Sequence, residues 1–261
     1  MSVEIVLINL DRSPDRLAFM SDQLGRLGLA FMRLSATDGS HILQDEFDRL
    51  SRSYMRPITR SELGCLTSHV RAWRHCVEIG RSILVLEDDV LLSGRLRDFL
   101  DEVETLDLPG LINLETRGTD KRVSRNPVAA TKSGVRLHRL LIDNGGTAAY
   151  VVSPSAAGAL LELSGTYAAP ADAFIDHSGV PRLQTDPGLV TLANEGFATT
   201  VVLPTRRERN ALALRNPHFK LRRLAGYVSK TFRKLGTAGN SATRTITACP
   251  TILPRADNRS A

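Results

Sequence analysis

The stretch from Ser82 to Leu92 limits the possible folds of this chain more than any other. Its first five residues are uncharged, and four of them are strongly apolar. Three consecutive carboxylates, Glu87, Asp88 and Asp89, follow at once. Such a short apolar run predicts a buried strand of a parallel sheet. The carboxylates then fall at the carboxyl end of the strand, where open α/β sheets bind their ligands.

The acidic triplet predicts a divalent metal site. Adjacent carboxylates repel one another, a cation relieves that repulsion, and hard oxygen ligands suit Mg²⁺ or Mn²⁺. Glu87 and Asp89 are the first and third members, so both can turn toward one ion where the strand gives way to a loop. The alternative is a solvated acidic turn, which the very apolar strand before it disfavours.

The beginning of the chain predicts a nucleotide-binding sheet. Residues 3–10 read as a strand, residues 14–27 as a helix with Ser13 as N-cap and Pro14 at its first position, and residues 31–36 as a second strand. The Gly-x-Gly-x-x-Gly turn of dinucleotide enzymes is missing from this region, which argues against NAD or FAD.

Periodicity and turn residues predict the remaining elements. In chain order we expect a loop over 56–63, a helix that Gly80 closes, a helix over 96–106, a strand over 110–115, a mobile loop over 116–126, an edge strand over 135–142, a strand over 148–152, a helix capped by Ser153, and a second acidic turn over 169–176.

The positive charge of the chain is concentrated in one segment. Residues 205–235 hold ten Lys or Arg and one Glu, a local charge of +9, so the remainder sums to −3 within a total of +6. Residues 217–235 combine basic and apolar side chains as an interfacial helix does, which predicts attachment to an anionic membrane surface. The alternatives are a basic helix packed on the domain and, less favoured because no base-reading motif accompanies it, nucleic-acid binding. Residues 236–261 lack core-forming periodicity and are predicted to be disordered.

Composition favours a cytoplasmic protein. Hydrophobic residues make up 42% of the chain, enough for a sizeable core, and no apolar run approaches the ~18 residues of a membrane helix. The first ten residues read as a strand rather than a signal peptide. Three cysteines, Cys65, Cys76 and Cys249, form no metal-binding spacing with one another and suit a reducing compartment. We therefore expect a cytoplasmic location, with peripheral attachment to the inner membrane through residues 205–235.

Six short motifs occur in order over roughly residues 3–180. They are Asn9-Leu10-Asp11-Arg12-Ser13 with Arg16, Ala36-Thr37-Asp38-Gly39, Glu62-Leu63-Gly64-Cys65 with Ser68-His69 and Trp73, Leu86-Glu87-Asp88-Asp89, Gly146-Thr147-Ala148-Ala149-Tyr150-Val151, and Pro170-Ala171-Asp172. Together the motifs resemble glycosyltransferase family 25, which includes bacterial lipooligosaccharide galactosyltransferases and collagen galactosyltransferases. The acid that often follows the last motif in that family is absent here, and nothing after about residue 200 matches.

The resemblance implies an α/β, GT-A-like nucleotide-sugar-binding fold with a mostly parallel central sheet flanked by helices. On this basis we expect a transferase domain over 1–204, the basic amphipathic extension over 205–235 and a disordered tail over 236–261. The resemblance also implies a UDP-sugar donor, usually UDP-galactose, a Mn²⁺-type cofactor and inversion at the anomeric carbon.

The resemblance and the residue chemistry together suggest roles for the acids. Glu87 and Asp89 are the expected metal ligands, with Asp88 on the donor, for example its ribose. Asp172 is the candidate general base, because an in-line displacement needs a carboxylate opposite the leaving group. The alternative is that Asp172 caps a helix. The reserve candidates are Asp176, Asp186, Glu195 and Glu115.

The expected donor-binding residues come from four motifs: Asn9, Asp11, Arg16, Glu62, His69, Asp88 and Gly146. Five of them have a structural alternative. Asp11 is also typical of a turn, and Arg16 of an exposed helical arginine. Glu62 equally suits the first turn of a helix, where it favours the dipole. His69 is more often a buried structural residue, and Gly146 also suits a tight turn.

The predicted function is a metal-dependent inverting transfer of a hexose, galactose in most of the family, from a UDP-sugar to a glycan or glycolipid acceptor of the surface-glycan type. Two alternatives stay open: a metal-dependent phosphoester hydrolase that uses the same carboxylates, and a non-catalytic sugar-nucleotide or glycan-binding protein on the same fold. The acceptor, the linkage and the identity of the sugar do not follow from the sequence.

Overall fold

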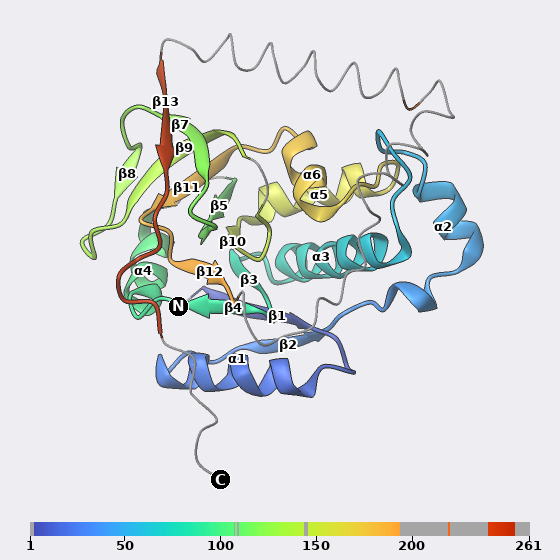
Figure 1. The fold of residues 1–261 in the computed structure, drawn as a ribbon, viewed down its shortest axis with the longest axis horizontal. Coiled ribbons are helices and arrows are strands. Elements are labelled where there is room, and N and C mark those ends of the chain that lie inside the picture. The colour runs from blue at the N-terminus through green and yellow to red at the C-terminus, as the bar shows by residue number, and fades with distance from the viewer. Residues whose placement is uncertain are drawn as a thin grey trace.

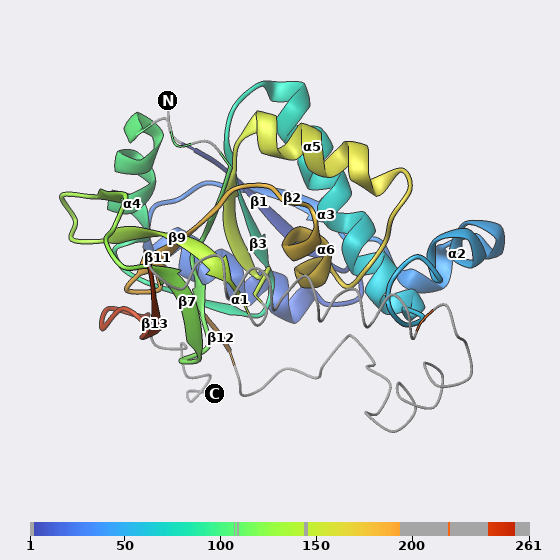
Figure 2. The same ribbon diagram turned by 90° about the horizontal axis from the view of Figure 1, so that it is seen from above.

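The computed structural model describes residues 3–106, 108, 110–143, 146–193, 219 and 240–253. Within these ranges, helices flank a large mixed sheet (Figures 1 and 2). The elements in chain order are β1 (Glu4–Asn9), α1 (Pro14–Arg26), β2 (Met32–Ser35), η1 (Gly39–His41), α2 (Gln44–Leu50), α3 (Arg60–Ile79), β3 (Ile83–Glu87), β4 (Val90–Leu92), α4 (Leu96–Val103), η2 (Glu104–Leu106), β5 (Leu111–Asn113), β6 (Glu115–Thr116), β7 (Asp120–Ser124), β8 (Ala129–Ala130), β9 (Arg136–Ile142), β10 (Ala149–Val152), α5 (Pro154–Ser164), α6 (Ala171–His177), β11 (Arg182–Asp186), β12 (Val190–Leu192) and β13 (Ser241–Thr245).

The main sheet is mixed. Its order in the described residues is β13-β7-β9-β11-β5-β10-β3-β1-β2, with β8 paired to β9, and a smaller sheet has the order β4-β12-β6. In the main sheet β1 is parallel to β2 and β3, and β5 is parallel to β11, but β10 runs antiparallel to both β3 and β5. The expectation of a mostly parallel sheet is therefore corrected, because β10 enters between two strands of the opposite direction.

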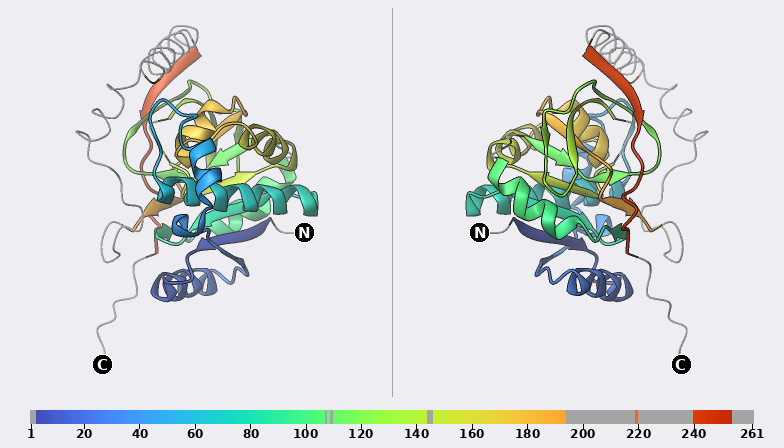
Figure 3. Two further views of the ribbon diagram at one scale, coloured as in Figure 1. Left: turned by 90° about the vertical axis from the view of Figure 1, so that its right-hand side faces the viewer. Right: turned by 90° about the vertical axis from the view of Figure 1, so that its left-hand side faces the viewer.

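Side-chain alternation along β1 and β3 builds two cores. Ile5 and Leu7 pack with α1 and α4 on one face of the sheet, and Val6 and Ile8 pack with α3, α5 and α6 on the other. Figure 3 shows β1 between α1 and α3. Residues 83–86 of β3 are fully buried, as their apolar run predicted, because both faces of the strand are covered. Glu87 therefore continues the face of Val85, toward α3.

Helix α3 crosses the second core, and its N-terminal half lies beside the carboxyl edge of the sheet. It begins with a capping box, in which Thr59 accepts a hydrogen bond from the backbone of Glu62 and Glu62 accepts one from the backbone of Thr59. It ends at Gly80, whose φ of 65° is a left-handed C-cap, as predicted. The helix starts at Arg60, inside the stretch that we expected to be loop, because the capping box sets the first turn earlier.

Three other local predictions differ from the structure. Residues 135–142 form an interior strand rather than an edge strand, since β9 has β7 and β11 as neighbours. The expected mobile loop over 116–126 contains β7, which gains hydrogen-bonded partners on both sides from β9 and β13. The acidic turn over 169–176 contains α6. Ser153 caps α5 as predicted, accepting a hydrogen bond from the backbone of Ala156.

Residues 240–253 pack against the N-terminal part of the chain. Strand β13 pairs with β7, the backbone N–H of Gly94 donates to the carbonyl of Thr251 at 2.8 Å, and that of Leu253 donates to Leu92 at 2.8 Å. The prediction of a disordered tail is therefore wrong for residues 240–253, which belong to the fold of the N-terminal part. The basic segment 205–235 lies outside the described residues except for Phe219, which is buried. Among the described residues, no helix has both the length and the apolar character needed to cross a membrane.

The backbone of α3 lies very close to the backbone of the loop after β2. A Cβ added to Gly64 would lie 2.7 Å from the carbonyl oxygen of Thr37 and 2.8 Å from the backbone nitrogen of Gly39. Ser68, one turn later, accepts a hydrogen bond from the backbone of Thr37 at 2.8 Å. The glycine and the serine together clamp the loop over 37–39 on the helix.

We predict that Gly64→Ala lowers the free energy of unfolding by roughly 1–3 kcal/mol, because neither backbone partner can move aside cheaply. The matched control is Gly158→Ala in α5, where an added Cβ meets no atom within 4 Å. That change should raise stability by roughly 0.5–1 kcal/mol through helix propensity alone. Urea unfolding of both variants measures the difference, and equal effects would contradict the predicted clamp.

Candidate functional site

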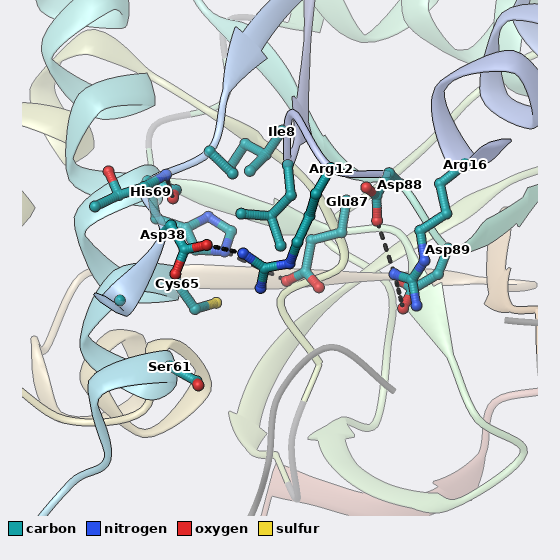
Figure 4. Close-up of a pocket in the computed structure, with 15 residues that line it drawn as sticks. Ile8, Arg12, Arg16, Asp38, Ser61, Cys65, His69, Glu87, Asp88 and Asp89 are labelled. Carbon is teal, nitrogen blue, oxygen red and sulfur yellow. Dashed lines mark hydrogen bonds and ion pairs between the residues drawn. The ribbon is translucent and has the colours of Figure 1, made fainter. Parts of the chain in front are cut away.

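A pocket lies at the carboxyl ends of β1 and β3, between the start of α1 and the N-terminal half of α3 (Figure 4). Its lining comes from the end of β1, the loop over 36–39, α3 and the acidic triplet. Parallel strands bring their carboxyl ends to one edge, so the motifs that follow β1, β2 and β3 meet here. The location agrees with the one expected from the apolar strand and its acids.

Asp88 fixes the geometry of this edge. One of its oxygens accepts a hydrogen bond from the Asn9 amide at 2.7 Å, and the other pairs with the Arg16 guanidinium at 2.9 Å. All three side chains are buried. Both oxygens of Asp88 thus bind protein groups, and the three predicted donor-binding residues hold β1, α1 and the end of β3 together at the wall of the pocket.

Asp89 has one carboxylate oxygen that can still accept a hydrogen bond or bind a cation. Its Oδ2 pairs with Arg16 at 3.1 Å, whereas its Oδ1 is buried and has no hydrogen-bond partner among the described residues. Desolvation and the neighbouring charges of Glu87 and Asp88 raise the pKa of Asp89 from 3.8 to about 6, against the opposing effect of Arg16. A buried oxygen without a partner, in a negative field, fits a cation ligand.

A buried chain of hydrogen bonds orients Glu87. The Trp73 indole N–H donates to the Tyr150 oxygen at 2.8 Å, so the Tyr150 hydroxyl is able to donate to His69 Nδ1 at 2.9 Å. The other ring nitrogen, Nε2, then carries the proton and donates to Glu87 Oε1 at 3.3 Å. Although desolvation raises the pKa of Glu87, the hydrogen bonds from His69 and Thr147 and the positive charge of Arg117 keep it below its ordinary value. His69 therefore orients an acid of the triplet from inside the core.

Glu62 lies at the start of α3 rather than in the pocket lining. It is buried, caps the helix with Thr59, and receives two hydrogen bonds from the Arg56 guanidinium at 2.9 and 2.7 Å. Desolvation raises its pKa, but these bonds outweigh that effect and hold the pKa below its usual value. These contacts match the alternative role of Glu62, that of an acidic residue in the first turn of a helix.

Asp11 is also placed apart from the acidic triplet. Its exposed carboxylate accepts hydrogen bonds from Arg33 at 2.5 Å and from Ser35 at 2.9 Å, and the Arg33 bond is the main reason why its pKa is lowered. Asp11 thus ties the end of β1 to the adjacent β2. Its neighbour Arg12 does line the pocket and forms an ion pair with Asp38 across it (Figure 4).

Asp172 lies in the first turn of α6, where its Oδ1 accepts a hydrogen bond from the backbone of Ala173 at 2.7 Å. The carboxylate is exposed to solvent, yet the protein around it raises its pKa by desolvation. The Ala173 bond and Arg117 oppose the rise, whereas Glu87 adds to it, so the two carboxylates are within electrostatic reach of each other. Asp172 is not among the residues that line the pocket of the acidic triplet.

The remaining candidates have protein partners. Gly146 has a φ of 135°, and a Cβ there would lie 3.0 Å from Glu115 Oε2, so glycine admits a protein carboxylate at this turn. Glu115 itself is buried and binds the Arg117 Nε at 2.6 Å and the backbone of Ala148 at 2.9 Å.

Three reserve candidates for the general base remain besides Glu115. Two of them form ion pairs, and the third lies outside the described residues. Asp176 pairs with Arg182 at 2.5 Å and Asp186 pairs with Arg136 at 3.0 Å. Glu195 lies outside the described residues.

Sequence reasoning missed three pocket residues, Arg12, Asp38 and Cys65. Arg12 and Asp38 stand just after two strands that pair in parallel, which is a signal that the predicted β-α-β unit already contained. Cys65 precedes His69 by four residues in one helix, a spacing that places both on one face. The spacing of the three cysteines relative to one another does not reveal this pair.

Comparisons with known proteins identify the family of this chain. A family model described as glycosyltransferase family 25 (LPS biosynthesis protein) matches residues 2–175. Procollagen galactosyltransferase 1 of Danio rerio is 32% identical over 119 residues, which are 40% of this chain and 20% of that protein. A glycosyltransferase 25 family member of Drosophila pseudoobscura pseudoobscura is 30% identical over 103 residues, 36% of this chain and 16% of that protein.

Membership of this group does not by itself imply turnover. A probable inactive glycosyltransferase 25 family member 3 of Bos taurus is 32% identical over 120 residues, 41% of this chain and 20% of that protein. The matched regions span about a fifth or less of the length of these relatives. The residues of the pocket itself must therefore carry any argument about activity.

We predict that Asp89→Asn stabilises the metal-free protein near neutral pH. The pKa of Asp89 is raised from 3.8 to about 6 in the folded state, so the folded state binds more protons across that window. The free energy of unfolding therefore falls as the pH rises through it, and removing the charge should recover on the order of 1 kcal/mol at about pH 7.5 but little near pH 4.

Urea unfolding with a chelator present at both pH values measures this effect. Asp88→Asn is the matched control, because it breaks a buried ion pair and should lower stability by about 3 kcal/mol. A loss of stability in Asp89→Asn near neutral pH would show that its carboxylate is already well satisfied by the protein.

Proposed function

Because the chain belongs to glycosyltransferase family 25, we propose that it transfers a hexose from a UDP-sugar to a glycan acceptor with inversion at the anomeric carbon. The observation that carries the proposal is the buried, unpartnered Oδ1 of Asp89 beside Glu87 at the carboxyl edge of the sheet. Some relatives are named inactive, so the proposal rests on these carboxylates as well as on the family.

A divalent cation, Mn²⁺ or Mg²⁺, suits this pair of acids. Asp89 would hold it through Oδ1, and Glu87 through Oε2, for which no hydrogen bond is found in the described part of the chain. When bound there, the ion supplies charge neutralisation for the diphosphate leaving group. His69 and Arg16 keep the two carboxylates in position without filling those oxygens.

The rest of the pocket suits a nucleotide. Ile8, Leu10 and Ala36 offer an apolar surface for a base, and Asp38 offers a carboxylate that can accept hydrogen bonds from ribose hydroxyls. Arg12 supplies positive charge within the same pocket for the phosphates. This mixture of one apolar wall and a few polar groups is the usual composition of a site for a small ligand.

Asp172 is the proposed general base. A carboxylate whose pKa is raised by its surroundings accepts a proton more readily near neutral pH than an ordinary Asp does. In the reaction the acceptor hydroxyl loses its proton to a carboxylate oxygen of Asp172 as the sugar–diphosphate bond breaks. The exposed position of Asp172 leaves room for an acceptor in front of it.

Galactose is the proposed sugar and a surface glycan of the lipooligosaccharide type the proposed acceptor. The galactose proposal follows the printed name of procollagen galactosyltransferase 1, and the acceptor follows the description of the family as LPS biosynthesis proteins. A cytoplasmic location, with the protein on the inner membrane, fits such an acceptor. A phosphoester hydrolase and a non-catalytic binding protein are the competing functions, and product analysis distinguishes them from a transferase.

The first test is a panel of UDP-sugars with and without Mn²⁺. We expect one donor, UDP-galactose, to raise the unfolding temperature and to release UDP only when the cation is present. Asp89→Asn should abolish turnover, whereas Asp98→Asn, an exposed acid on α4, should not change it. Release of inorganic phosphate would indicate a hydrolase, and cation-independent binding without turnover a binding protein.

The second test concerns Asp172. We expect Asp172→Asn to lower kcat by ~10²–10⁴-fold with little change in UDP affinity, because the amide keeps the shape of the side chain but cannot accept the proton. If the variant loses UDP affinity and keeps its kcat, Asp172 belongs to the donor site and the base lies elsewhere.

We also propose that residues 205–235 hold the protein on an anionic membrane. Each basic residue near such a surface contributes about 1 kcal/mol before screening by salt. The full chain should sediment with anionic vesicles at low salt, dissociate at high salt and ignore neutral vesicles. Replacing the six basic residues of 217–235 by Gln should leave the protein in the supernatant, and unchanged sedimentation would contradict the proposal.

A further inference from the structure

Cys65 places a thiol beside the acidic triplet, and the proposed transfer reaction does not use it. The sulfur of Cys65, a ring nitrogen of His69 and a carboxylate oxygen of Glu87 all lie within 4.8 Å of one another. Figure 4 shows the Cys65 side chain directed into the pocket, with His69 and Glu87 bordering the same space. Three different ligand types thus lie close enough together to be candidates for one ion.

The fold explains why they converge. Cys65 and His69 are four residues apart in α3, so their side chains lie on the same face of the helix, one turn apart. Glu87 continues the face of β3 that packs against α3, because side chains alternate along the strand. A regular helix and a regular strand therefore fix the three groups, and no mobile loop is needed to assemble them.

The ligand set differs in chemistry from the carboxylate pair Glu87 and Asp89. Oxygen ligands alone suit Mn²⁺ or Mg²⁺, whereas a thiolate, an imidazole and a carboxylate suit Zn²⁺, which takes all three kinds of ligand. Catalytic and inhibitory zinc sites commonly have three protein ligands and a water molecule as the fourth. The half-buried position of Cys65, in a pocket that reaches solvent, leaves room for that water.

The electrostatic field at the sulfur favours a cation. Cys65 lines the same pocket as the three carboxylates Glu87, Asp88 and Asp89. The same negative potential that disfavours a bare thiolate attracts a divalent ion. When the ion binds, the thiol proton leaves to bulk water and the positive charge of the metal stabilises the thiolate.

The hydrogen bond behind His69 also suits a metal ligand. Its Nδ1 lies 2.9 Å from the Tyr150 hydroxyl, and a bound His commonly makes such a bond with its second nitrogen. Metal binding at Nε2 requires the ring proton to move to Nδ1, from which it donates to the Tyr150 oxygen. The 3.3 Å contact between Nε2 and Glu87 Oε1 is then replaced by coordination of both groups to one ion.

We propose that Cys65, His69 and Glu87 form a binding site for Zn²⁺ that shares Glu87 with the carboxylate pair Glu87 and Asp89. Zinc at the thiol side and Mn²⁺ at the carboxylate side compete for that one side chain. The zinc site does not depend on the proposed transferase activity, because it is defined by metal binding alone.

Cobalt absorption tests this site on the full-length, reduced and metal-free protein. Co²⁺ replaces Zn²⁺ in such sites, and a bound thiolate gives a charge-transfer band in the near ultraviolet. We expect one equivalent of Co²⁺ to produce the band and Zn²⁺ to remove it by displacement. Cys65→Ser should lose the band and bind zinc at least about tenfold more weakly, whereas the matched control Cys249→Ser should retain both.

Two further measurements keep the test decisive even if Cys65→Ser fails to fold. X-ray absorption of zinc on the unmodified protein should show one sulfur neighbour at about 2.3 Å and a nitrogen neighbour at about 2.0–2.1 Å. Asp89→Asn should keep the cobalt band while losing Mn²⁺ binding, which separates the two sites. No band in the wild-type protein, a band that survives in Cys65→Ser, or a zinc shell without sulfur would each overturn the proposal.

Discussion

The ion pair between Arg16 and Asp88 holds the site together. It joins the first turn of α1 to the residue after β3, and the Asn9 amide adds the end of β1. Both partners are buried, so each would carry a large desolvation penalty without the other. Such a pair adds little to the net stability of the fold, and its main effect is to fix the relative positions of the elements that it joins. It therefore defines where the edge of the sheet lies relative to the first helix.

The guanidinium of Arg16 also pairs with Asp89. Arg16 reaches its Oδ2 as well as Asp88, but one cation does not balance three neighbouring acids, and Asp89 Oδ1 is left buried without a partner. The result is a local excess of negative charge inside an otherwise satisfied network. Unsatisfied polar groups and uncompensated charges of this kind are typical of functional sites, because a bound ligand can satisfy them.

How far the sequence predicted the structure depended on the range of the interactions. The strand 83–87, the helix ending at Gly80 and the location of the acids followed from local periodicity and from the rule for carboxyl ends. The direction of β10, the interior place of β9 and the return of β13 depend on pairing between distant segments, which no local pattern encodes. Glu62 is the opposite case, because its partners Thr59 and Arg56 are near in sequence and the spacing of Thr59 and Glu62 is the local signature of a capping box.

Helix α3 couples these features into one unit. Its N-terminal half holds the loop over 37–39 through Gly64 and Ser68, and that loop lines the side of the pocket proposed to bind the nucleotide. The residue after Ser68, His69, orients Glu87 on the proposed metal side of the pocket and is supported by Tyr150. A shift of the helix would therefore move both walls of the pocket together. The two halves of the site keep their relative geometry because the same rigid element supports both.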